Sequence, residues 1–337
     1  MNNLDNPIVI TGANGNVGSL VAENLLKANI PVRAVAREIY KIKKLKDLGA
    51  ELVESKFVDV PTLTKAFTGA KAVFVLTPLP IKANDLNGVQ YENVNGIIKA
   101  IKNSGVKNVV LLSSWGTELP AKTGGILGCR YFEMELDKIP DLNVQILRPV
   151  WFMENFIYNV GLIKVAGING AAINPDVKFP MVDTRDIAAV ATKYLKEMNF
   201  KGRNVHYISG PREYSMRQVT EILGNSIGKP GMKYIEFPQS VMKKGMVDSG
   251  VLSANAADML IEINQCISNG IIKSELRSAK NTTSTTLEEF ARSKFAPAYH
   301  AAKNPSFFEK IPGVFLKLFL NVAGKRMIRK EQMSNAW

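Results

Sequence analysis

The chain has 337 residues, of which 46% are hydrophobic, and its 43 lysines and arginines outnumber its 30 aspartates and glutamates, for a net charge of +13. This composition is typical of a globular protein with a sizeable core and excludes the disordered and fibrous classes. The polar first residues and the lack of a long apolar run predict neither a secretory signal nor a membrane span, so we expect a cytoplasmic protein.

The few potential metal ligands and the spread of the basic residues exclude two further classes. The two cysteines, Cys129 and Cys266, and the two histidines, His206 and His300, fit no metal-ligand spacing, so we expect no metal. The basic residues are distributed over many predicted helices without a zinc-finger or RNA-binding motif, so we expect no nucleic-acid partner.

Strand-like and helix-like patterns alternate over the first 150 residues. Short runs rich in Val, Ile and Leu predict buried strands at 7–12, 32–37, 51–57, 72–77, 108–114 and 144–149. The helical patterns between them include one that ends at Gly105, a plausible C-terminal cap. This alternation predicts an α/β fold with a doubly wound parallel sheet, which binds ligands at the carboxyl ends of its strands.

Three glycines, Gly12, Gly15 and Gly18, lie between the first predicted strand and the first predicted helix, in TGANGNVG. One can adopt a positive φ in the turn, another lets the backbone approach a diphosphate, and the third lets the helix pack on the strand. The helix N-terminus then offers N–H groups and a positive dipole to the phosphates. The pattern predicts a dinucleotide-binding loop, and a merely tight strand–helix turn is the alternative.

The end of the second strand distinguishes NADPH from NADH. An acidic residue there accepts hydrogen bonds from the ribose 2′-hydroxyl, whereas an arginine suits the 2′-phosphate. Arg37 ends this strand and Lys41 follows one turn later, so the sequence favours NADP(H). Glu38 is adjacent to Arg37, but neighbouring strand residues point to opposite faces. An exposed basic surface is the alternative interpretation of Arg37 and Lys41.

The alternation is less regular after residue 150. We expect a loop that leads into a helix over 179–198, a strand over 204–210, a helix that begins at Ser215, and mostly helical structure over 240–290. Neither an internal repeat nor a low-complexity linker separates this part, so it is expected to fold back onto the sheet.

Several of these segments resemble the NmrA-like family, a branch of the atypical short-chain dehydrogenases. The resemblance covers most of residues 7–300. The matching segments are TGANGNVGSLVAENLL, VRAVAR, LTKAFTGAKAVFVLTP, GVKNVVLLSS, LRPVWFMENF, FPMVDTRDIAAVA and YISGP. The family includes NAD(P)H-dependent quinone and dye reductases, and also NADP-binding redox sensors without clear turnover.

With this resemblance, we expect three parts in the chain. Residues 1–150 form an NAD(P)-binding Rossmann domain. Residues 151–302 form a smaller, intergrown α/β substrate region, of which 177–198 returns to the Rossmann core. Residues 303–337 form a basic amphipathic tail.

The resemblance also implies where a bound NADP(H) would lie. The glycine loop would contact the diphosphate through Thr11, Gly12, Ala13, Asn14, Gly15, Asn16 and Val17, and the end of the second strand would contact the 2′-phosphate through Arg37 and Lys41. The end of the third strand would contact the adenine through Phe57 and Val58. The end of the fourth strand would contact the diphosphate and the nicotinamide ribose through Thr77, Pro78 and Leu79. Phe152, Met153, Glu154 and Asn155 would lie near the nicotinamide. Lys56 stands where many relatives have an aspartate, so a carboxylate contact to the adenine is not expected.

The catalytic pair of the short-chain dehydrogenases is absent. These enzymes use Tyr-x-x-x-Lys, in which the tyrosine donates a proton and the lysine lowers its pKa. The segment GILGCRYFEMELDKI has Leu127 at the tyrosine position and Tyr131 at the lysine position. Tyr131 is therefore the candidate catalytic residue, as a proton donor or a ribose contact; a helix residue without a catalytic role is the alternative.

The other candidate residues are five polar positions and two tryptophans, and most of them are expected to have structural roles. Ser113 and Ser114 have no histidine base nearby in the predicted fold, so we expect no serine nucleophile. Asp183, Arg185 and Asp186 are expected to order a loop and cap the helix that follows. Trp115 and Trp151 are expected either to border the substrate cavity or to lie in the core.

Two functions remain open from the sequence. The first is an NADPH-dependent oxidoreductase that acts on a small conjugated acceptor, quinone-like by family analogy. The second is a non-catalytic NADP(H)-binding redox sensor that docks a protein partner. The missing Tyr/Lys pair favours the sensor, but a quinone is already a good hydride acceptor and needs little acid catalysis.

The C-terminal segment KIPGVFLKLFLNVAGKRMIRK predicts a basic amphipathic helix with Lys317, Asn321 and Lys325 on one stripe. A protein partner, an anionic membrane surface and the chain's own domain are the alternatives for what this tail contacts. We expect a monomer or a homodimer.

Overall fold

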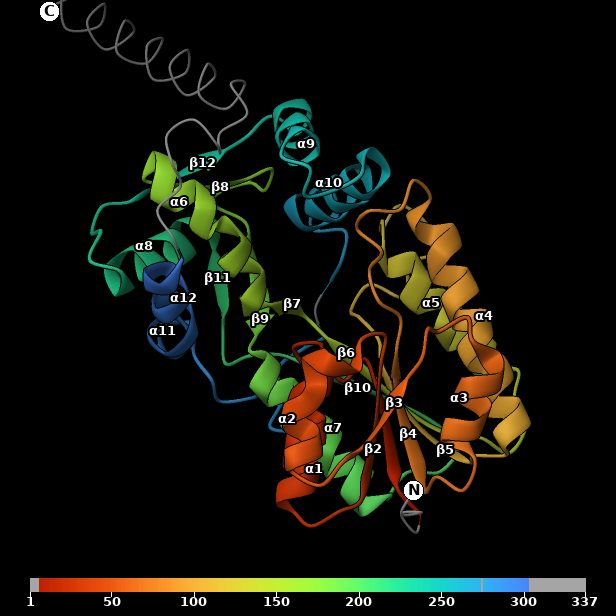
Figure 1. Cartoon of the computed structure of the whole chain (residues 1–337). Coiled ribbons are helices and arrows are strands. Elements are labelled where there is room, and N and C mark those ends of the chain that lie inside the picture. The colour runs from red at the N-terminus through yellow and green to blue at the C-terminus, as the bar shows by residue number, and fades with distance from the viewer. Residues whose placement is uncertain (1–5, 274, 303–337) are drawn as a thin grey trace, which may run out of the picture.

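The computed structural model describes residues 6–273 and 275–302 (Figure 1). The predicted tail, residues 303–337, lies outside the described residues. Within the described ranges, no helix combines the length and the apolar character that crossing a membrane requires.

A seven-stranded sheet, parallel throughout, forms the centre of the fold. Its strand order is β10-β6-β5-β4-β1-β2-β3. The strands are β1 (Ile8–Thr11), β2 (Val32–Ala36), β3 (Glu51–Glu54), β4 (Ala72–Leu76), β5 (Asn108–Leu112), β6 (Asn143–Pro149) and β10 (Arg203–Ile208). The sequence predicted all seven, and the inner five appear as largely apolar runs because they are covered on both faces.

Helices cover both faces of this sheet. Ile8 and Ile10 of β1 pack in one hydrophobic core and Val9 packs in the other, because successive strand side chains point to opposite faces. The first core includes α1 (Gly18–Lys27) and α7 (Thr184–Glu197), which pack against each other. The second core includes α3 (Val60–Phe67), α4 (Leu86–Ser104) and α5 (Ile126–Asp137). Two short helices, η1 (Ile39–Ile42) and α2 (Lys43–Asp47), connect β2 to β3.

The strand order reverses between β1 and β4. From β1 the chain continues to β2 and β3 on one side, and from β4 it continues to β5 and β6 on the other. The loops after β1 and β4 therefore leave in opposite directions and open a crevice at their carboxyl ends, where doubly wound sheets bind ligands.

Most of the other described residues form a smaller, intergrown α/β region. It holds the sheet β11-β9-β7 and the pair β12-β8. These strands are β7 (Trp151–Phe152), β8 (Ile168–Ala171), β9 (Lys178–Val182), β11 (Glu213–Ser215) and β12 (Lys233–Glu236). The helices are η2 (Met153–Asn159), α6 (Val160–Ala166), α8 (Met216–Ser226), α9 (Gln239–Asp248), α10 (Ala254–Ser268), α11 (Leu287–Phe290), the π-helical turn η3 (Ala291–Phe295) and α12 (Ala296–Ala301).

Several predictions of helix ends are confirmed, and two predictions for the later part of the chain are wrong in part. Ser215 caps α8 in a reciprocal capping box with Gln218, and Gly105 ends α4 with a left-handed conformation, both as expected. The loop predicted before α7 contains β9, which pairs with both β7 and β11. The described residues between 271 and 285 are not helical, and part of this segment pairs with the chain beyond β10 through Ser209 and Thr282.

Candidate functional site

The loop between β1 and α1 has the close packing that its glycines predict. Gly12 adopts a φ of +60°, which favours glycine. A Cβ atom on Gly18 would collide with the carbonyl oxygen of Gly12 and lie 3.0 Å from its carbonyl carbon. A Cβ on Gly15 would lie 3.2 Å from the same oxygen. The start of α1 is therefore held directly against the turn that ends β1.

The N-terminus of α1 is open to solvent. No side chain caps it, and Asn14, Gly15 and Asn16 are exposed in front of it. The side chains of the other loop residues point inward: Thr11 Oγ1 donates to the carbonyl oxygen of Phe74 at 3.0 Å, and the side chains of Ala13 and Val17 are buried. An uncapped helix N-terminus with exposed loop backbone can bind a diphosphate.

The loop that follows β4 lies beside this glycine loop. Leu76, at the end of β4, is the side chain nearest to the position of a Cβ on Gly12, at 3.1 Å. The next residue, Thr77, has a buried Oγ1 with no hydrogen-bond partner among the described residues. It is one of seven such buried side-chain atoms among the described residues, and a ligand bound at the crevice would give this one a partner. Pro78 is half-buried and Leu79 is exposed.

The basic residues after β2 differ in their surroundings. Arg37 is exposed, and no hydrogen bond or ion pair engages it within the described ranges. Lys41 pairs with Glu38, with Nζ 2.9 Å from Oε2. Glu38 also accepts a hydrogen bond from Tyr40, and the bonds from Tyr40 and Lys41 hold the Glu38 pKa below its ordinary value. Arg37 is therefore available to an anionic ligand, whereas Lys41 would first have to break its ion pair with Glu38.

The expected adenine side is shaped by a glycine that the sequence analysis missed. A Cβ on Gly96 of α4 would collide with the carbonyl oxygen of Phe57, so this glycine lets the loop after β3 lie against α4. Phe57 is half-buried and Val58 is exposed. A glycine in the middle of a helical pattern is a signal that could have found this contact.

The segment expected near the nicotinamide mixes exposed and buried side chains. Phe152 and Asn155 are half-buried, whereas Met153 lies in the core. Glu154 is 7% exposed and turns inward, where its carboxylate contacts the Thr184 backbone N–H and the Lys294 ammonium. Phe152 and Asn155 are thus the side chains of this segment better placed to contact a ligand.

Tyr131, the candidate catalytic residue, faces α4. Its hydroxyl donates a hydrogen bond to Asn95 Oδ1 at 2.8 Å, and its ring lies 4.6 Å, centroid to centroid, from that of Tyr91. The Tyr131 hydroxyl therefore already donates its hydrogen bond to a side chain of α4.

A buried carboxylate, Glu133 of α5, organises the end of β5. It accepts hydrogen bonds from Ser113 Oγ at 2.6 Å and from Thr117 Oγ1 at 2.9 Å, and pairs with Arg148 Nη2 at 2.6 Å and with Arg203 Nη2 at 3.0 Å. The sequence analysis did not identify this cluster. The Ser113 hydroxyl is thus held by the carboxylate of Glu133.

The acidic residues after β9 have the structural roles that the sequence predicted. Asp183 caps α7 by accepting from the backbone N–H of Arg185 at 2.7 Å. Asp186 accepts from the backbone N–H and the hydroxyl of Thr285. The described part of the chain contains no group of three or more His, Cys, Asp or Glu side chains that could hold a metal ion.

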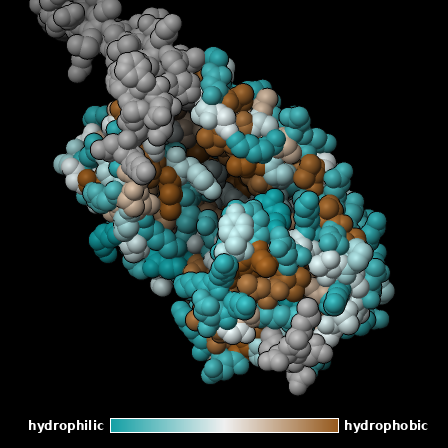
Figure 2. All heavy atoms as spheres, viewed as in Figure 1, coloured by the Kyte–Doolittle hydropathy of each residue, from teal (hydrophilic) through white to brown (hydrophobic). Residues whose placement is uncertain are grey.

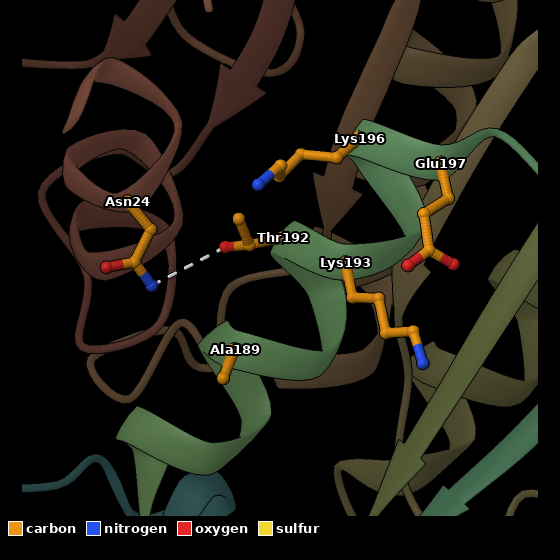
Figure 3. A pocket seen from close by; sticks show the side chains of 6 residues that line it. All are labelled: Asn24, Ala189, Thr192, Lys193, Lys196 and Glu197. Atoms are coloured by element: carbon orange, nitrogen blue, oxygen red, sulfur yellow. Dashed lines mark hydrogen bonds between the residues drawn. The ribbon is translucent and has the colours of Figure 1, made fainter. Parts of the chain in front are cut away.

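The surface is hollowed between the carboxyl edge of the central sheet and the helices α9 and α10 (Figure 2). A separate pocket of about 290 Å³ lies between α1 and α7 and is lined by Asn24, Ala189, Thr192, Lys193, Lys196 and Glu197. Figure 3 shows Asn24 facing Thr192 across this pocket, with both lysine side chains extended. This pocket lies between helices that cover one face of the sheet, away from the crevice, and its charged residues are exposed.

Comparison with known proteins gives concordant matches. The profile of the NmrA-like family matches residues 5–291. The chain is 26% identical over 297 residues to an NAD(P)H azoreductase of Xenophilus azovorans, a match that covers 88% of this chain and 98% of that protein. The structure of the Escherichia coli NADPH-dependent quinone oxidoreductase QOR2 with NADPH is similar at a TM-score of 0.72 and 23% identity, over 84% of this chain and 98% of that one. The negative transcriptional regulator NmrA in complex with NADP is similar at a TM-score of 0.67 and 14% identity, over 88% and 98% of the two chains.

Proposed function

The chain belongs to the NmrA-like family, and from this premise we propose that it is an NADPH-dependent oxidoreductase acting on a small conjugated acceptor. The observation that carries the proposal is the glycine loop, which presents an uncapped helix N-terminus beside an orphaned hydroxyl at the reversal of the strand order. Redox activity is supported by the names of relatives, an NAD(P)H azoreductase and a quinone oxidoreductase.

The proposal assigns roles to residues of this chain. The loop from Gly12 to Val17 binds the diphosphate through its backbone, Arg37 binds the 2′-phosphate, and Thr77 hydrogen-bonds the cofactor near the nicotinamide ribose. Lys41, Phe57, Val58, Pro78, Leu79, Phe152 and Asn155 complete the binding surface. A bound nicotinamide supplies the hydride, and the chain supplies orientation and electrostatics. Residues 151–302, which include the hollow's upper wall, hold the acceptor.

The alternative function is an NADP(H)-binding redox sensor. One observation favours it: the hydroxyl of Tyr131, the candidate proton donor, donates its hydrogen bond to Asn95. In that case a protein partner, or an anionic surface recognised by residues 303–337, would respond to the bound cofactor.

The test of the proposed function is NADPH oxidation over a panel of quinones and azo dyes, with NADPH binding measured in parallel. Oxidation that requires both the protein and an acceptor supports the reductase. Tight NADPH binding without oxidation by any acceptor supports the sensor.

Tyr131→Phe is expected to retain most of the reductase activity, with a loss in kcat/KM of less than about tenfold, because its hydroxyl already donates to Asn95 of α4 and the sequence lacks the Tyr-x-x-x-Lys pair. The comparison uses the best acceptor found, and Asn95→Ala serves as a control that frees the same hydroxyl. A loss of about a thousandfold in Tyr131→Phe alone would identify Tyr131 as the catalytic acid.

A further inference from the structure

A cluster of two buried carboxylates and a half-buried lysine joins three distant parts of the chain beside the expected nicotinamide end of the site. Lys294 Nζ lies 2.5 Å from Glu154 Oε1 and 2.7 Å from Asp183 Oδ1. Both carboxylates are removed from solvent, Glu154 at 7% exposure and Asp183 at 0%. The segments that carry them are the two family motifs LRPVWFMENF and FPMVDTRD, which meet here.

Each buried carboxylate of this cluster contacts at least one cation. Glu154 sits at the start of η2 and also accepts from Thr184, in the first turn of α7. Asp183 binds Arg185 Nη2 at 2.9 Å, and Arg185 in turn lies 3.5 Å from Glu289 of α11. For Glu154, the ammonium of Lys294 is the contacting cation within the described residues. Two neighbouring carboxylates are costly to bury, and without Lys294 one of them would lack a counter-charge.

The backbone that carries Lys294 has an unusual conformation. Lys294 lies in the π-helical turn η3, between α11 and α12. Phe290 and Phe295, on either side of it, are fully buried and anchor this turn in the core. Single π-helical turns occur frequently at functional sites, because they redirect a side chain that a regular helix would place elsewhere.

We propose that Lys294 is a positioning residue, whose ammonium fixes the segment from Phe152 to Asn155 against the start of α7 and thereby sets the wall that borders the nicotinamide. Its effect on turnover rests on the proposed function, whereas its effect on this segment does not. Lys294 acts through Glu154, and Phe152 and Asn155 are the side chains that it places.

The test compares Lys294→Met with Lys294→Arg, which retains the charge. We expect Lys294→Met to lower kcat roughly tenfold or more, because small displacements of positioning groups have large effects on rate. The Kd of NADPH is expected to change less than about threefold, because the loops proposed to bind the phosphates lie elsewhere. Lys294→Arg is expected to retain most of the activity.

The pH dependence of stability tests whether the Lys294 ammonium balances a buried carboxylate. In Lys294→Met, a buried carboxylate that has lost its counter-charge is more stable protonated than ionised, so protonation favours the folded state of this variant. The stability that this protonation contributes is present at low pH and is lost as the pH rises and the carboxyl ionises. We therefore expect the Tm of Lys294→Met, relative to the natural protein, to fall between about pH 5 and about pH 8. The double variant Lys294→Met/Glu154→Gln, which removes the unpaired charge, is expected to show no such fall.

Each outcome decides the proposal. Loss of kcat in Lys294→Met, retention in Lys294→Arg and a pH-dependent Tm support it. An unchanged kcat, or equal losses in kcat and NADPH affinity, would overturn it. If none of the acceptors supports NADPH oxidation by the natural protein, the proposed function fails. The Tm profiles then still show whether Lys294 balances a buried carboxylate, and a flat profile for Lys294→Met contradicts that part of the proposal.

Discussion

Gly18→Ala is expected to weaken NADPH binding by roughly tenfold or more and to destabilise the protein by about 1–3 kcal/mol. The added methyl group would meet the carbonyl group of Gly12, which is backbone and cannot rotate away as a flexible side chain can. Either α1 or the loop must move. Both carry the groups proposed to bind the diphosphate, so stability and affinity should fall together.

The matched control is Gly161→Ala. Gly161 also lies near the N-terminus of a helix, α6, but no heavy atom is within 4 Å of the position of its added Cβ. Alanine in a helix is better than glycine by up to about 1 kcal/mol, so this variant is expected to be neutral or slightly more stable. Urea unfolding and fluorescence titration with NADPH measure both proteins. Equal behaviour of the two variants would contradict the packing role of Gly18.

Arg37→Ala is expected to weaken NADPH binding roughly 10- to 150-fold, the factor that corresponds to one hydrogen bond to a charged group. Arg37 directly follows β2, and it is exposed and unpaired in the described structure. A guanidinium can hold a phosphate through two parallel hydrogen bonds. NADH lacks the 2′-phosphate, so its affinity should change little, and the preference for NADPH should largely disappear.

Lys41→Ala provides the comparison for Arg37→Ala. Lys41 pairs with Glu38, and a cofactor phosphate would have to compete for its ammonium, so its removal is expected to have the smaller effect. Titrations of both cofactors at low and physiological salt measure this, since salt screens exposed charges. Equal weakening of NADPH and NADH by Arg37→Ala would show that Arg37 does not recognise the 2′-phosphate. A natural preference for NADH would indicate that Glu38 faces the ribose.

The sequence predicted the five inner strands of the central sheet well because they are mostly buried and read as largely apolar runs. The edge strands β3 and β10 are more exposed and carry charged residues. The strand β9 was missed because its five residues include Pro180 and lead directly into a helix. The sequence over 271–285 lacks an apolar period, and the conformation around Thr282 depends on pairing with a distant segment.

The site was predictable to the extent that it is local in sequence. The glycine loop and the end of β2 each lie within one short segment, so their pattern could be interpreted directly. The cluster of Glu154, Asp183 and Lys294 could not, because more than 100 residues separate Lys294 from either partner. Sequence patterns do not show which distant charges the packing brings together.

The proposed activity is the oxidation of NADPH by a small acceptor. The most direct test mixes the natural protein with NADPH and each acceptor of the quinone and azo-dye panel, and follows loss of the near-ultraviolet absorbance of NADPH, with Arg37→Ala as the matched protein. We expect the natural protein to oxidise the cofactor only when an acceptor is present, and at a higher rate with NADPH than with NADH. We expect Arg37→Ala to lose this preference. Saturable NADPH binding with no oxidation in the presence of any acceptor would contradict the reductase and leave the sensor.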